Sequence, residues 1–228
     1  MIERVKTGVP GLDELIGGGI PKGHLVLVSG GPGAGKTVLS SQIVYTGATV
    51  YGERGLYATF SESPEALKRN LMSFGWNFEE LEKRGLVKIM GLPAIIGEAA
   101  DLLGYLVDEA AEFGAQRLVV DSFTALVLSL GENVGDLRAF AHTLYRSIKR
   151  IGCPLSILVA ETPYGQAGIG MGVEEFIVDG IMLLKMRANE RRVHRSIMIL
   201  KMRGTEHDLN CHPMIIDSQG VRIMPEIE

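Results

Sequence analysis

A glycine-rich segment that directly follows an apolar run constrains the fold of this chain more than any other feature. The apolar run covers residues 24–29 (HLVLVS), and residues 30–37 (GGPGAGKT) come next. A stretch compatible with a helix begins at Thr37. Glycines let the backbone curl so that successive N–H groups point into the loop, and the start of a helix adds the positive end of its dipole. Strand, loop and helix in this order predict a site for an anionic group.

The anion expected in this loop is the phosphate chain of a nucleotide. The segment fits the pattern G-x-x-x-x-G-K-[ST], with the strand and helix that this pattern requires on either side. In such a loop Lys36 places its charge on the β- and γ-phosphates, and the hydroxyl of Thr37 ligates Mg²⁺. A glycine-rich turn with an incidental Lys-Thr pair would not need these flanking elements. The predicted nucleotide-binding residues are Gly30, Gly31, Pro32, Gly33, Ala34, Gly35, Lys36, Thr37 and Val38.

Apolar runs of strand length alternate with longer helix-like stretches along the first 180 residues. This alternation predicts an α/β fold: a RecA-like phosphate-loop core with a mostly parallel, twisted sheet flanked by helices. Beyond Gly180 two pairs of strand-like runs, each joined by a polar turn, predict an antiparallel hairpin extension. The expected strands are 24–29, 55–60, 86–90, 117–121 and 154–160, the helices 37–47, 64–74, 97–113 and 136–151, and the hairpins 181–187 with 194–204 and 214–216 with 221–224.

Length and composition favour one domain. The chain has 228 residues, of which 46% are hydrophobic, enough for one complete core and somewhat few for two. We therefore expect a single ATPase domain over residues 1–228. It would comprise a lead-in over 1–23, the core over 24–180 and the strand hairpins over 181–228.

Composition also argues against several functional classes. No run approaches the roughly 20 apolar residues needed to span a bilayer. A net charge of −4 lacks the basic excess of non-specific nucleic-acid binding. The two cysteines, Cys153 and Cys211, have neither a C-x-x-C nor a metal-ligand spacing, which suits a reduced compartment. We expect a cytoplasmic protein without a membrane partner.

Acidic and hydroxyl residues follow three of the predicted strands. In an open parallel sheet, ligands bind beyond the carboxyl ends of the strands. Asp121 is predicted to support Mg²⁺, directly or through water, although it could cap the next segment instead. Glu62 is predicted to orient or deprotonate the attacking water, the alternative being a helix-capping glutamate. Either Glu161 or Thr162 is a candidate sensor of the γ-phosphate, and the sequence does not separate them.

Two cations near the carboxyl terminus form a further candidate. Lys201 and Arg203 flank Met202, and on an extended strand residues two apart project from the same face. Cations of this kind stabilise transition-state charge in phosphoryl transfer. One interpretation is therefore delivery of both charges to a neighbouring subunit's ATP, because the pair lies far from the loop in the sequence. The other is a solvated edge strand protected by its basic residues.

Taken together, these motifs resemble the KaiC-like branch of the RecA superfamily of ATPases. The phosphate loop alone would be shared with many NTPases, whereas residues 201–207 (KMRGTEH) are specific. The resemblance is greatest to the first of KaiC's two ATPase domains, because Glu175-Phe176 stand where the second carries a Ser-Thr phosphorylation pair. The other matching segments are 7–13 (TGVPGLD), 18–23 (GGIPKG), 121–126 (DSFTAL) and 172–176 (GVEEF).

The resemblance implies a RecA-like core, hexameric rings with Mg-ATP between protomers, and slow hydrolysis. It also implies that Lys201 and Arg203 reach the neighbour's γ-phosphate, so the expected catalytic residues are Lys36, Glu62, Lys201 and Arg203. Members of this family usually carry two adjacent glutamates after the second strand. Here Ser61 precedes Glu62, which places more weight on the one glutamate that is kept.

Three functions are compatible with these observations. The first is an ATP-hydrolysing ring that acts on a protein partner, and the second is a recombinase-like or recombinase-accessory ATPase that binds single-stranded DNA. Against the second, the loops 129–136 and 163–171 contain no Lys or Arg to neutralise phosphates. A nucleotide-gated scaffold with negligible turnover is the third. The basic hairpin residues, which would contact DNA, a second subunit or solvent, are Lys185, Arg187, Arg191, Arg192, His194 and Arg195.

Overall fold

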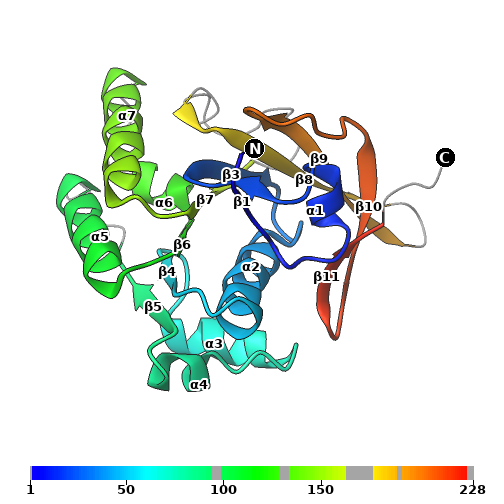
Figure 1. The fold of residues 1–228 in the computed structure, drawn as a ribbon, viewed down its shortest axis with the longest axis horizontal. Helices are drawn as coiled ribbons and strands as arrows, with labels where there is room; N and C mark the ends of the chain where they lie inside the picture. Colours follow the sequence, from blue (N-terminus) through cyan, green and yellow to red (C-terminus); the bar gives the residue numbers. More distant parts are fainter. Residues whose placement is uncertain (1, 94–98, 129–133, 163–176, 189–191, 225–228) are drawn as a thin grey trace.

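The computed structural model describes residues 2–93, 99–128, 134–162, 177–188 and 192–224. Within these residues nine strands form one sheet in the order β11-β10-β9-β8-β3-β7-β6-β4-β5 (Figure 1). Its members are β3 (His24–Gly30), β4 (Gly55–Thr59), β5 (Val87–Gly91), β6 (Arg117–Asp121), β7 (Leu155–Glu161), β8 (Gly180–Ala188), β9 (Val193–Met202), β10 (Cys211–Asp217) and β11 (Gly220–Ile223). The first six strands of this list run parallel, and β9, β10 and β11 continue the sheet antiparallel. The predicted α/β class and the antiparallel extension are confirmed.

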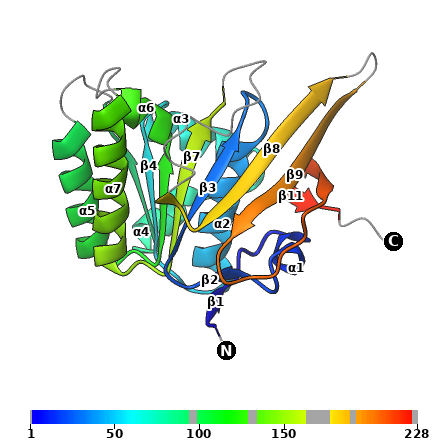
Figure 2. The same ribbon diagram turned by 90° about the horizontal axis from the view of Figure 1, so that it is seen from above.

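Helices cover both faces of the parallel strands. Figure 2 shows α5 and α7 side by side on one face and α2 on the other. The helices are α1 (Leu12–Leu15), α2 (Lys36–Val50), α3 (Pro64–Met72), α4 (Phe78–Lys83), α5 (Ala99–Phe113), α6 (Phe123–Leu128) and α7 (Val134–Ile151). The short helices α1, α4 and α6 were not predicted, nor were the two-residue strands β1 (Arg4–Val5) and β2 (Ile20–Pro21). Elements of two to six residues are too short to show a clear hydrophobic period.

The apolar strands supply both halves of the core. Along β3, Leu25 and Leu27 pack on the side of α5 and α7, while Val26 and Val28 pack on the side of α2. This alternation follows from the two-residue period of a strand. Because both faces are covered, the strand is buried almost throughout, and its sequence is continuously apolar rather than alternating.

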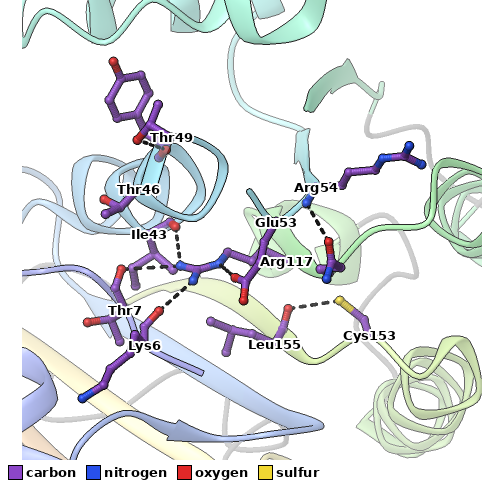
Figure 3. A network of polar contacts seen from close by, with 12 residues as sticks. Lys6, Thr7, Ile43, Thr46, Thr49, Glu53, Arg54, Arg117, Cys153 and Leu155 are labelled. Atoms are coloured by element: carbon purple, nitrogen blue, oxygen red, sulfur yellow. Dashed lines mark hydrogen bonds and ion pairs between the residues drawn. The ribbon is translucent and has the colours of Figure 1, made fainter. Parts of the chain in front are cut away.

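A buried arginine ties the amino-terminal lead-in to the core. Figure 3 shows the Arg117 side chain, from the start of β6, directed at the Glu53 carboxylate. Arg117 is only 1% exposed, and its Nε atom donates to that carboxylate at 2.6 Å. Its Nη1 and Nη2 atoms donate to the carbonyls of Ile43 and Lys6, each at 2.7 Å. A buried guanidinium is stable only when its charge and donors are satisfied, as they are here. The network joins the lead-in, α2 and the strand that ends at Asp121.

The terminal hairpin is attached to α2 by one glutamine. The Gln42 side chain donates from Nε2 to the Val221 carbonyl at 2.9 Å and accepts from the Val221 amide at 2.6 Å. Both residues are buried. The two bonds pair the amide and the carbonyl of Val221 on β11, which would otherwise be buried without a hydrogen-bond partner.

Replacing Gln42 by leucine is expected to lower the free energy of unfolding by about 2 kcal/mol, because it leaves a buried N–H and a buried C=O of Val221 unpaired. Urea unfolding followed by the fluorescence of Trp76 measures this, since Trp76 packs close to Gly220 on the same hairpin. Gln219→Leu on the exposed turn is the control and should stay within about 0.5 kcal/mol. Equal stability of the two variants would contradict the view that the bonds between Gln42 and Val221 stabilise the fold.

Candidate phosphate-binding site

Strand register brings the predicted site residues to one edge of the sheet. Gly30 at the end of β3 lies opposite Glu161 on β7, and Asp121 at the end of β6 lies opposite Thr59 on β4. Glu62 follows β4 by three residues. The carboxyl ends of these four parallel strands therefore place the glycine-rich loop, Asp121, Glu62 and Glu161 side by side, as the sequence predicted.

The loop over residues 30–37 adopts conformations that require glycine. Gly33 and Gly35 have φ angles of 74° and 101°, in the left-handed region that side-chain-bearing residues avoid. At Gly35 a Cβ atom would also come within 2.6 Å of the Ile216 side chain. The helix α2 begins at the next residue, Lys36, so its unpaired N–H groups open onto the loop. Val38 in the first turn packs partly buried against the core.

Lys36 is directed back over the loop. Its Nζ atom donates to the Gly31 carbonyl at 3.0 Å. Burial lowers the pKa of Lys36, and the nearby carboxylates of Glu161 and Asp121 partly oppose that shift. A half-buried ammonium that lies on a loop carbonyl and near two acids is suited to exchange these partners for phosphate oxygens.

A hydroxyl and a carboxylate meet beside the loop. Thr37 donates from Oγ1 to Asp121 Oδ2 at 2.8 Å, and the Tyr57 hydroxyl donates to the same oxygen at 2.6 Å. Both oxygen ligands suit Mg²⁺, which prefers hard oxygen donors and one or two carboxylates. Among the described residues there is no cluster of three His, Cys, Asp or Glu side chains for another metal. Thr37 and Asp121 thus fit the magnesium of a bound nucleotide.

Tyr57 is a site residue that was not predicted from the sequence. Its ring is buried on β4, and burial, followed by the charge of Asp121, raises the pKa of its hydroxyl well above the usual value. The hydroxyl therefore stays protonated and holds one lobe of the Asp121 carboxylate in place. The available signal was a single phenol in the otherwise apolar strand GLYAT, whose oxygen had to find a buried partner.

Glu62 is half-buried at the same edge. Its carboxylate accepts from Asn70 Nδ2 at 3.1 Å, and its backbone N–H and C=O both bond the Thr59 hydroxyl. Burial, and then the charge of Asp121, raises the pKa of Glu62. Ser61 is exposed, and Ser63 caps α3, accepting from the Ala66 amide at 3.2 Å. The capping role that was the alternative for Glu62 is thus filled by Ser63.

Glu161 and Thr162 differ in their surroundings. The Thr162 hydroxyl is buried and lies 3.1 Å from the Ser29 hydroxyl, whereas the Glu161 residue is exposed. The Glu161 backbone amide donates to Thr124 Oγ1 at 2.8 Å, which holds the strand end on α6. The charge of Glu161 acts on Lys36. Of the two residues, Glu161 is therefore the one whose charge reaches Lys36, while the Thr162 hydroxyl is engaged with Ser29.

Lys201 and Arg203 lie at the opposite end of the parallel strands from the phosphate loop. The Arg203 carbonyl is 3.0 Å from His24 Nε2, at the first residue of β3, while the phosphate loop follows the last. The seven residues of β3 span about 20 Å, too far for either side chain to reach its own subunit's loop. Met202 is buried between them, so the predicted alternation holds, although β9 ends at Met202.

Asp179 holds Arg203 in place within the subunit, and the Val178 carbonyl holds Lys201. The Asp179 carboxylate pairs with Arg203 Nη1 at 3.1 Å and with Lys149 Nζ at 2.6 Å. Burial opposes ionisation of Asp179, but the hydrogen bonds from Lys149 and the Leu25 amide outweigh it and lower its pKa. Lys201 donates to the Val178 carbonyl at 2.6 Å. Arg203 keeps a half-exposed side chain directed at the surface.

Some predicted features lie outside the described residues. These are the segments 163–171 and 172–176, Arg191, and most of the loop 129–136. Of the basic hairpin residues, Arg195 contacts the phosphate loop through the Gly33 carbonyl. Within the described part of the chain, no helix combines the length and apolar character needed to cross a membrane.

Comparison with known proteins agrees with this arrangement. A solved KaiC-like protein from the archaeon Pyrococcus horikoshii superposes with a TM-score of 0.90 at 35% identity, covering 99% of this chain and 100% of that one. The fold and the loop therefore define a RecA-like phosphate-loop core. The family model of the KaiC ATPase matches residues 5–228, so the chain belongs to the KaiC ATPase family.

Relatives with full-length similarity carry family names without a stated activity. A UPF0273 protein of Methanopyrus kandleri is 36% identical over 99% of this chain and 93% of its own length. A UPF0273 protein of Thermotoga maritima is 37% identical over 99% of this chain and 97% of its own length. The similarity spans the lead-in and the terminal hairpins as well as the loop.

Proposed function

We propose that this chain is a single-domain ATPase that binds Mg-ATP on residues 30–38 and hydrolyses it slowly to ADP and phosphate. The observation that carries the proposal is the 2.8 Å bond between Thr37 and Asp121, because it places a magnesium-ligand pair beside the loop and Lys36. Membership of the KaiC ATPase family supports ATP as the nucleotide.

Four residues at this edge have roles in that reaction. Lys36 neutralises charge on the β- and γ-phosphates. Thr37 and Asp121 would hold the magnesium ion, which would stabilise the charge that develops on the phosphate oxygens. Glu62 receives the proton of the water that attacks the γ-phosphorus as the bond to the bridging oxygen breaks. The raised pKa of Glu62 brings it closer to neutral pH, where a general base is most effective.

The proposed working form is a ring of identical subunits, a hexamer by resemblance to the family, with ATP at each interface. The positions of Lys201 and Arg203 support a ring, because both residues lie at the end of the sheet farthest from their own phosphate loop. Head-to-tail contact would bring this end of one subunit to the loop of the next. A strict monomer with and without Mg-ATP would remove the basis for this form.

Subunit mixing tests the ring and the two cations together. Glu62→Gln lacks the base, and the double variant Lys201→Ala with Arg203→Ala lacks the cations, so each should be inactive alone. A random one-to-one mixture is expected to regain about a quarter of the wild-type phosphate release, because one interface in four combines an intact base with intact cations. No recovery would show that the cations do not act on a neighbouring subunit.

A protein is proposed as the partner of the ring rather than nucleic acid. The net charge of −4 and the absence of Lys and Arg from residues 129–136 and 163–171 support this choice. A salt titration of single-stranded DNA binding separates the two. Steep loss of affinity with salt, abolished by replacing Arg191 and Arg192, would favour the recombinase-like function instead.

A further inference from the structure

The β8–β9 hairpin contacts the phosphate loop of its own subunit. Arg195 on β9 donates from Nε to the Gly33 carbonyl at 2.9 Å. Its cross-strand partner on β8, Met186, lies next to the same glycine. A Cβ atom added to Gly33 would be 3.4 Å from the Met186 sulfur. One cation and one thioether from the hairpin therefore converge on the middle of the loop.

This contact sets the orientation of one loop peptide. The peptide that joins Gly33 and Ala34 has its carbonyl on Arg195, and its amide donates to the Gly31 carbonyl at 3.3 Å. A peptide unit is planar, so fixing the direction of the carbonyl also fixes the direction of the amide. Loops of this kind bind phosphate through such amides. Arg195 thus restrains a group that a nucleotide would meet.

Arg195 differs from Arg187, another arginine on the hairpin. The Arg195 residue is partly buried, and among the described residues it forms no ion pair with a carboxylate. Arg187 on β8 is exposed and forms no hydrogen bond with the loop over residues 30–37. A guanidinium that bonds through Nε keeps the N–H donors of both Nη atoms. The position of Arg195 is therefore specific to the loop rather than typical of a solvated basic hairpin.

We infer that Arg195 is a positioning residue for the phosphate loop. By fixing the Gly33 carbonyl it holds the peptide between Gly33 and Ala34, whose amide exchanges its long 3.3 Å bond to the Gly31 carbonyl for the β-phosphate of ADP or ATP. The inference rests on the proposed function and adds the hairpin to the nucleotide site. It also gives a role to a cation otherwise expected to contact DNA, a second subunit or solvent. Preorganisation of this kind increases affinity by reducing the ordering that binding requires.

The test compares Arg195→Gln, Arg195→Lys and Arg187→Gln. Arg195→Gln is expected to weaken the binding of ADP and of ATPγS to a similar extent, each by about tenfold in Kd, or 1.4 kcal/mol. Arg195→Lys should recover part of the loss, because an ammonium donates to a carbonyl without the planar fork of arginine. Arg187→Gln is the matched control and should bind as the wild type does. Affinities come from equilibrium titration, and melting without nucleotide verifies that each variant folds.

Four outcomes would overturn the inference. Unchanged affinity of Arg195→Gln would show that the contact does not matter, and a loss confined to ATPγS would indicate direct contact with the γ-phosphate. Equal losses for Arg187→Gln would indicate the general field of the hairpin. Loss of single-stranded DNA binding with unchanged nucleotide affinity would assign Arg195 to nucleic acid. If the wild type itself bound no nucleotide, the proposed function would fail before Arg195 was tested.

Discussion

Replacing Lys36 by alanine is expected to weaken Mg-ATP binding at least about 100-fold, or roughly 3 kcal/mol, with phosphate release falling to background. The reason is that the variant removes the one ammonium that lies over the loop, where burial has already removed much of its hydration. Isothermal titration with ATPγS and magnesium measures the affinity.

A lysine at the other end of the molecule serves as the control. Lys22→Ala removes an exposed ammonium that pairs with Glu3 at 2.8 Å, far from the loop. Its affinity for ATPγS should match that of the wild type. If Lys36→Ala bound ATP as tightly as Lys22→Ala, the loop would not be a phosphate site, and the proposed ring and hydrolysis would lose their basis.

Replacing Glu62 by glutamine is expected to lower kcat by about 10²- to 10⁴-fold, the usual contribution of a positioned general base. ATP affinity should change by less than about threefold, because Glu62 contacts Asn70 and Thr59 rather than the loop. Single-turnover phosphate release separates kcat from binding. Glu65→Gln, in the first turn of α3, removes an exposed carboxylate and is the matched control.

The same residue gives a pH signature. The pKa of Glu62 is raised above its ordinary value of 4.5, and only the ionised carboxylate can accept a proton. The kcat of the wild type should therefore be highest above this raised pKa and fall as the pH falls through it. Glu62→Gln should lack this acidic limb. If the limb and most of kcat persisted in Glu62→Gln, another group would be the base, and the scaffold function with negligible turnover would not apply either.

Local sequence patterns were enough to predict much of the fold and part of the site. Residues 24–29, 117–121 and 154–160 were predicted as strands, and the structure has β3, β6 and β7 there within one residue at each end. Each is mainly apolar and of strand length, as expected for a strand covered on both faces. The ends of these strands also gave Asp121 and Glu161, because the carboxyl ends of parallel strands share an edge.

Contacts between strands far apart in the chain lay beyond those patterns. Tyr57 meets Asp121 across 64 residues and Arg195 meets Gly33 across 162, and neither pairing has a spacing that a local period could show. The distance of Lys201 and Arg203 from the loop likewise depends on which end of β3 the hairpin reaches. The sequence alone therefore established the phosphate loop and the alternation of strands and helices, since both arise from neighbouring residues. Only the tertiary structure decided which side chains face the loop, because strand order and register are set by packing across the whole sheet.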